Sequence, residues 1–145
     1  MTEREIYAKN KIKEIESIAM SARDRSPIKN PIDIAQALGY DVILTKLSND
    51  APAFVLSDRG QIFISNTVDK YSQQILCAHE LGHLLLDNCN SVSLFDEAID
   101  CISEFEANVF AYYLYPKAFS RLDFEKNDTI GKFNRFVASQ INYIY

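Results

Sequence analysis

Apolar side chains recur at steps of three and four residues along several stretches of the chain, which is the spacing of an amphipathic α-helix. The pattern predicts an N-terminal helix over about residues 3–23, a second over about 68–86 and a third over about 96–114, which Pro116 ends. A further helix is predicted over about 129–144, where the spaced apolar residues are Ile130, Phe133, Phe136, Val137 and Ile141.

Three shorter apolar runs lie between the first two of these helices and have the length of strands. They cover residues 42–44, 53–56 and 61–64, and Gly60 marks a tight turn between the last two. We expect a small antiparallel sheet of about three strands within about residues 41–65, packed on a helical bundle that includes the helix over 68–86. The sequence therefore predicts an α+β fold, as a single domain over residues 1–145.

Composition and charge exclude several classes of protein. The apolar content of 48% and the charged content of 24% are those of a globular domain, and the net charge of −5 argues against direct nucleic-acid binding. The charged N-terminus is unlike a signal peptide, and no apolar run is long enough to span a membrane. The three cysteines are an odd number without a C-x-x-C pair, which favours a cytoplasmic protein.

The chain's two histidines both lie in the motif His79-Glu80-Leu81-Gly82-His83, within the predicted helix over 68–86. Residues four apart stand one above the other on a helix, so His79 and His83 can direct ring nitrogens at one zinc ion. Glu80 lies about 100° further round the helix. It can therefore take a proton from a zinc-bound water whose pKa the ion lowers from 15.7 to about 7.

The third ligand must come from another element, because the chain has no third histidine. The predicted helix over 96–114 offers Glu104 and Glu106, which lie about 200° apart around the helix axis and cannot both face one ion. We favour Glu104, because Asn108 follows it on the same face and can accept the outer ring N–H of a liganding histidine. Glu106 and Cys101 stay open as alternatives.

Residues 79–86 (His-Glu-Leu-Gly-His-Leu-Leu-Leu), residues 104–111 (Glu-Phe-Glu-Ala-Asn-Val-Phe-Ala) and the following Leu-Tyr-Pro resemble the ImmA/IrrE family of zinc metallopeptidases. Members of that family carry H-E-x-x-H-x-L-L-L, then E-x-x-A-N-x-F-A, then Leu-x-Pro. The resemblance covers about residues 30–116. The second box is similar to the E-x-x-x-D box of gluzincin peptidases, and by that likeness Glu104 binds zinc and Asn108 orients a histidine.

This resemblance implies a zincin-like minimal core with one Zn²⁺ ion, in a cytoplasmic bacterial protein of phage or mobile-element type. Family members cleave or inactivate helix-turn-helix repressors, so the resemblance implies an endopeptidase that acts on such a repressor through Glu80. The alternative is a non-proteolytic, zinc-containing binding module that sequesters a repressor in the manner of an anti-repressor or antitoxin. The negative charge of the chain suits a basic, DNA-binding protein partner better than DNA itself.

Overall fold

Four α-helices and a three-stranded sheet make up residues 3–48, 51–86 and 101–118, which are the residues that the computed structural model describes. In chain order these elements are α1 (Glu3–Arg23), α2 (Pro31–Ala37), β1 (Asp41–Thr45), β2 (Ala53–Leu56), β3 (Gln61–Ser65), α3 (Lys70–Leu85) and α4 (Cys101–Leu114). The predicted α+β class is confirmed. The predicted helix over 129–144, and residues 96–100 of the predicted third helix, lie outside the described residues.

The sheet is mixed rather than wholly antiparallel, which corrects the prediction. Its strand order is β1-β3-β2, with β3 antiparallel to β2 and parallel to β1. The turn between β2 and β3 forms as expected, with Gly60 in the left-handed region at φ 62°. The hairpin places β3, not β2, against β1, and the reversal of direction at the hairpin then makes β1 and β3 parallel.

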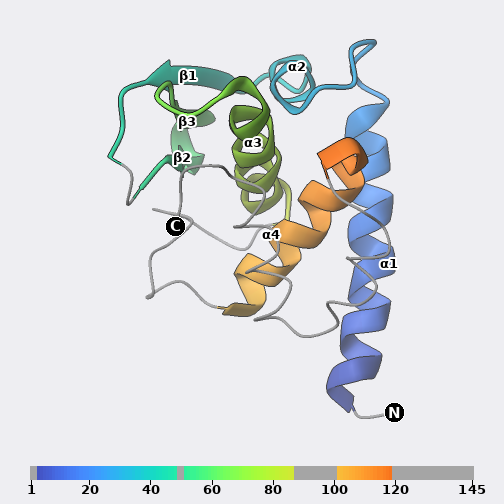
Figure 1. Cartoon of the computed structure of the whole chain (residues 1–145). Helices are drawn as coiled ribbons and strands as arrows, with labels where there is room; N and C mark the ends of the chain where they lie inside the picture. The colour runs from blue at the N-terminus through green and yellow to red at the C-terminus, as the bar shows by residue number, and fades with distance from the viewer. Residues whose placement is uncertain (1–2, 49–50, 87–100, 119–145) are drawn as a thin grey trace.

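The core lies between one face of this sheet and the helices. Ile62 and Ile64 of β3, with Ala53 and Val55 of β2, are at most 3% exposed and point toward α3. Figure 1 shows the order of the layers, with α3 beside the sheet, α4 against α3, and α1 on the far side of α4. The sheet thus supports α3, the helix that carries the H-E-x-x-H motif.

Helix α3 begins two residues later than predicted, at Lys70. Its cap is Asp69, whose side chain accepts a hydrogen bond from the Ser72 amide at 2.7 Å. The start predicted at about residue 68 would place the cap at Asn66 or Thr67. Both contribute to the end of the sheet instead, since the Asn66 amide bonds to the Thr45 carbonyl and the Thr67 hydroxyl to that of Ser65.

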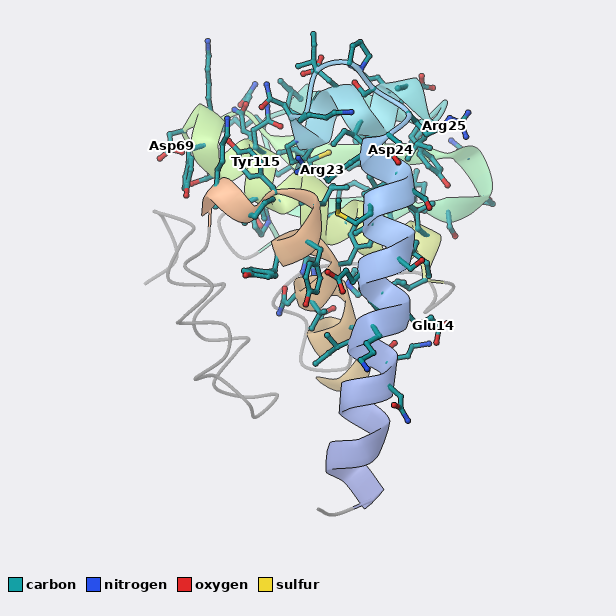
Figure 2. All side chains as sticks on the ribbon, turned by 90° about the vertical axis from the view of Figure 1, so that its right-hand side faces the viewer. Glu14, Arg23, Asp24, Arg25, Asp69 and Tyr115 are labelled. Atoms are coloured by element: carbon teal, nitrogen blue, oxygen red, sulfur yellow. The ribbon has the colours of Figure 1, made fainter. Side chains whose placement is uncertain are left out.

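An arginine ties the far ends of α1 and α4 together. The Arg23 guanidinium donates a hydrogen bond of 2.8 Å to the carbonyl of Leu114, the last residue of α4, and Figure 2 shows Arg23 beside this end of the helix. A cation there also meets the negative end of the helix dipole. The Lys29 ammonium in turn donates to the Arg23 carbonyl at 2.6 Å. These bonds fix α4 along α1, although 91 positions separate Arg23 from Leu114.

None of the helices in the described ranges combines the length and the apolar character that crossing a bilayer requires.

Helices α3 and α4 approach each other closely at Gly82. A Cβ atom added there would lie 3.1 Å from the Cα and the carbonyl oxygen of Ala107, and 3.1 Å from a ring carbon of Phe110. Two of these three atoms belong to the backbone of α4, so they can move away only if the whole helix moves. Gly82 therefore sets the distance between the two helices, as its small size suggests.

We predict that Gly82→Ala destabilises the protein by about 1 kcal/mol, measured by urea unfolding of the metal-free protein. Alanine favours helix by about 1 kcal/mol over glycine, but overpacking a close contact costs about 1–3 kcal/mol. Gly82→Ala should cost less in a Phe110→Leu background than in the unmodified protein, because one of the three contacts is absent there. A gain in stability for Gly82→Ala alone would contradict this account of the helix contact.

Candidate metal centre

The two histidines of α3 lie one turn apart in the centre of the molecule. His79 and His83 are 0% and 1% exposed, and their Nε2 atoms are 3.1 Å from each other. This is the convergence that a spacing of four residues on a helix predicts. The two rings meet edge to face, with an angle of 80° between their planes, so both nitrogens point at one region between α3 and α4.

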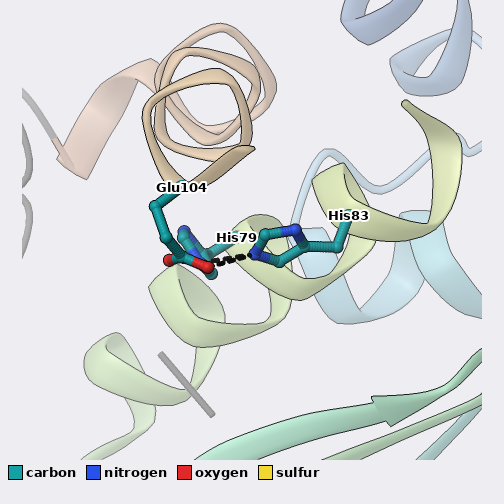
Figure 3. Close-up of side chains that lie close together, drawn as sticks. All are labelled: His79, His83 and Glu104. Carbon is teal, nitrogen blue, oxygen red and sulfur yellow. Dashed lines mark hydrogen bonds and ion pairs between the residues drawn. The ribbon is translucent and has the colours of Figure 1, made fainter. Parts of the chain in front are cut away.

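Helix α4 places the Glu104 carboxylate in that region. One carboxylate oxygen lies 2.9 Å from Nε2 of His79 and the other lies 2.9 Å from Nε2 of His83, as Figure 3 shows. The three side chains are all buried and their ligand atoms lie within 4.8 Å of one another. Glu104 reaches the imidazoles because α4 runs close to α3 at Gly82, one residue before His83.

Asn108 determines which nitrogen of His79 carries the proton and which one directs a lone pair at the Glu104 carboxylate. Its amide oxygen lies 2.5 Å from Nδ1 of His79, and an oxygen can only accept, so Nδ1 carries the proton. In the neutral ring the other nitrogen, Nε2, then holds a lone pair directed at Glu104. The contact expected between Asn108 and a histidine is present, and it prepares His79 to bind a cation.

Burial by itself raises the pKa of the Glu104 carboxyl. When the two imidazoles are protonated, their positive charges and the hydrogen bonds that they donate lower the pKa by more, so that its value is about 2. Glu104 therefore carries a negative charge at neutral pH. A metal ligand must be ionised in this way, because a protonated carboxyl offers a weaker donor.

The donor set fits a divalent metal ion. Lone pairs and a carboxylate that approach one another to 2.9–3.1 Å repel unless a proton or a metal ion lies among them. Donor atoms around a tetrahedral zinc ion, with bonds of about 2.0–2.1 Å, lie about 3.3 Å apart, which is close to these distances. Two imidazole nitrogens and one carboxylate are also the ligands of catalytic zinc centres that keep one position open.

Two other carboxylates are buried nearby but lie outside this donor group. Glu80 follows His79 on α3 and is 0% exposed, while Glu106 of α4 is 7% exposed. The structure thus brings Glu104, and not Glu106, to the histidines. The Cys101 side chain is not among those described.

Arg23 supports the helix that carries Glu104, a role that the sequence reasoning missed. It does not touch the donor group, but its bond to Leu114 holds the helix on which Glu104 lies. The sequence shows only that Arg23 is a basic residue near the end of a predicted helix. It does not indicate that Arg23 bonds to the Leu114 carbonyl.

We predict that Glu104→Gln removes bound zinc, whereas Glu106→Gln retains it. An amide cannot replace the charge of the Glu104 carboxylate, so zinc affinity should fall at least about 100-fold. The measurement is zinc per chain by mass spectrometry, with affinity from competition against a chromophoric chelator. Loss of zinc in Glu106→Gln together with full zinc in Glu104→Gln would reverse the assignment.

We also predict that Asn108→Ala lowers zinc affinity by about 10–100-fold, because His79 loses the group that fixes its tautomer. Asn108→Asp should preserve or raise the affinity, since a carboxylate accepts the same N–H more strongly. The same chelator competition measures both variants. Equal affinity in Asn108→Ala and the unmodified protein would show that the hydrogen bond does not prepare the ligand.

The family of the chain can be stated from its sequence match. The model of the IrrE N-terminal-like domain, peptidase family M78, matches residues 35–130, about two thirds of the chain. A comparison with curated proteins gave no match. The match includes the H-E-x-x-H helix and Glu104, in agreement with the resemblance seen in the motifs. The chain belongs to the ImmA/IrrE family of IrrE N-terminal-like domains.

Proposed function

We propose that this protein is a zinc-dependent endopeptidase. The observation that carries the proposal is the convergence of His79, His83 and Glu104 on one point, with Glu80 buried next to His79 on the same helix. Membership of a peptidase family supports a metallopeptidase-like role. Glu80 is adjacent to the metal-binding pair but outside the donor set. Such a position suits the general base of a catalytic centre better than a ligand of a structural centre.

The residues divide the proposed reaction among them. His79, His83 and Glu104 would hold the ion, which when bound acidifies a water molecule and polarises a peptide carbonyl. Glu80 would accept the proton of the attacking water and pass it to the departing amine. Asn108 would keep the His79 ring in one orientation throughout. The burial of Glu80 keeps bulk water from competing for its proton.

We infer that an extended peptide can bind beside α3, at the edge of β2 with which no other described strand pairs. Strand β2 lies at one edge of the sheet and packs against α3. The Ser65 amide bonds to the Pro52 carbonyl, and in an antiparallel pair the hydrogen-bonding direction alternates along the strand. The backbone groups of Ala53 and Val55 therefore point away from β3. A substrate segment could pair with them as an additional strand.

We propose that the substrate is a helix-turn-helix repressor of a phage or mobile element, and that the reaction occurs in the cytoplasm. The net charge of −5 supports a basic protein as partner, because opposite charges speed association. The family to which the chain belongs supports the choice of a repressor, by the resemblance described above.

A second candidate function is a zinc-containing module that sequesters the repressor without cutting it. The burial of the donors favours it, because His79, His83 and Glu104 are at most 8% exposed, as is typical of a closed structural centre. In that case a fourth protein ligand would complete the coordination of the ion.

We predict that Glu80→Gln lowers proteolysis about 100- to 10,000-fold while zinc content is unchanged. An amide has the shape of the carboxylate but cannot accept the proton. Cleavage is measured on a quenched fluorogenic peptide library, and in cells by immunoblot of helix-turn-helix repressors co-expressed with the chain. Glu106→Gln, another buried glutamate outside the donor group, is the matched control and should keep full activity.

The two candidate functions give different results in this experiment. If the repressor is inactivated equally by the unmodified protein and by Glu80→Gln, with the repressor intact and bound, the chain acts by sequestration. If Glu80→Gln retains zinc and still cleaves at the original rate, Glu80 is not the general base.

A further inference from the structure

The second edge of the sheet is β1, and among the strands that the structure describes only β3 pairs with it. In Figure 1 β1 is at the upper edge of the sheet, with β3 and then β2 below it. The Asp41 amide bonds to the Gly60 carbonyl, and the Thr45 carbonyl accepts from the Asn66 amide. The direction of the backbone N–H and C=O groups alternates from residue to residue. Those of Ile43 therefore also point at β3, whereas those of Val42 and Leu44 point outward.

These outward groups have no hydrogen-bond partner among residues 3–48, 51–86 and 101–118. The side chains at the edge are apolar too: Leu44 is 47% exposed, and Val42 and Ile43 are partly exposed. Soluble proteins usually protect such an edge with proline, a bulge or a central charge. The run Val42-Ile43-Leu44 has none of these, so it is suited to pairing with another strand.

We propose that β1 pairs antiparallel with β1 of a second copy of this chain, about a two-fold axis at Ile43. Ile43 is the centre of the five-residue strand, so this register alone pairs all five residues of both copies. Val42 faces Leu44 of the second copy, and Leu44 faces Val42. These two pairs exchange four main-chain hydrogen bonds, which use all the outward amides and carbonyls of the strand.

The side chains in this register are complementary. Asp41 faces Thr45 of the second copy, so no like charges lie directly opposite each other within the strand. Just beyond the strand, Lys46 comes to the level of Tyr40 of the second copy, so this lysine does not face a like charge either. A charged residue at the axis would face the same charge in the second copy and would oppose the dimer. The residue at the axis of this strand is the neutral Ile43.

An apolar row on the outer face of the sheet continues across the proposed interface. Ile43 lies beside Phe63 of β3, and the Phe63 ring stacks on Phe54 of β2 with ring centroids 4.7 Å apart. The two Ile43 side chains would meet at the axis as a closely spaced pair without mutual hydrogen bonds. The row would then run unbroken through six strands, and a second copy would cover the exposed part of Leu44.

This pairing does not rest on the proposed peptidase function. Strand β3 separates β1 from β2, and it is β2 and β3 that pack against α3. A dimer formed through β1 therefore leaves the metal centre and the β2 edge uncovered in both copies. An inactive protein that still dimerises, or an active protein that stays monomeric, would separate the two proposals.

The first test is the mass of the full chain by sedimentation equilibrium from about 5 to 500 µM, a range suited to a small interface. We expect a concentration-dependent dimer. Amide hydrogen exchange should slow with concentration at Val42 and Leu44, and not at Ile43, whose amide already bonds to β3. A monomer at every concentration, or a dimer without this protection, overturns the proposal.

Leu44→Pro tests the hydrogen bonds. Proline removes an outward amide that β3 does not use, so the sheet should survive while the dimer dissociates at least about tenfold more readily. Circular dichroism and zinc content verify that the variant is folded. Should it fail to fold, Leu44→Lys tests the same edge in another way, because it keeps the amide but places a charge among the apolar side chains of the interface. A dimer of unchanged strength in the folded variant would place the interface elsewhere.

The register is tested by Ile43→Cys in a background of Cys89→Ser and Cys101→Ser. Residues that face their own copy at the axis lie close enough for a disulfide, so mild oxidation should give a covalent dimer. The matched control is Asp41→Cys, which faces Thr45 of the second copy and should stay uncrosslinked. Equal crosslinking at both positions, or crosslinking of Asp41→Cys alone, would overturn the register.

Discussion

The close contact between α3 and α4 at Gly82 is the constraint on which the metal centre depends. The two imidazoles and the Glu104 carboxylate come from different helices, and their atoms converge to 2.9–3.1 Å only if the helix backbones approach. Gly82 and Ala107 allow that approach, and the bond from Arg23 to Leu114 holds α4 from its other side. The glycine that weakens the helix locally is therefore what brings the third donor within reach.

The same convergence makes the site costly to the fold without a cation. A carboxylate and two imidazoles with little exposure to water lose solvation, and their lone pairs face one another. The low pKa of Glu104 shows how the histidines compensate, since they favour its charged form despite its burial. A metal ion would supply the same compensation without protonating the ligands, so metal binding and folding should be coupled in this domain.

Helical spacing allowed most of the candidate site to be predicted, because its residues lie within two short local patterns. The direction of a side chain on a helix repeats with its sequence position, so the sequence alone favours Glu104 over Glu106 and indicates that Asn108 contacts a histidine. The order of the strands was beyond such reasoning. Each strand has the same local pattern whether β2 or β3 lies beside β1. Only the packing of the β2–β3 hairpin decides that β3 takes this place. The predicted cap of α3 was wrong for a related reason. Asn66 and Thr67 are residue types that can cap a helix, but both form hydrogen bonds at the end of the sheet instead.

The central position of β3 also determines how one small sheet can have two separate roles. Strand β3 is the middle strand of the described sheet, so β1 and β2 are its edges, and of these two β2 packs against α3. With β3 in the centre, one open edge borders the helix that carries His79 and Glu80, and the other faces away from it. Strand pairing recognises the backbone and has little sequence preference, so two open edges would compete for the same peptides. A second copy on β1 would remove that competition and leave β2 as the edge at which an extended segment can reach the metal centre.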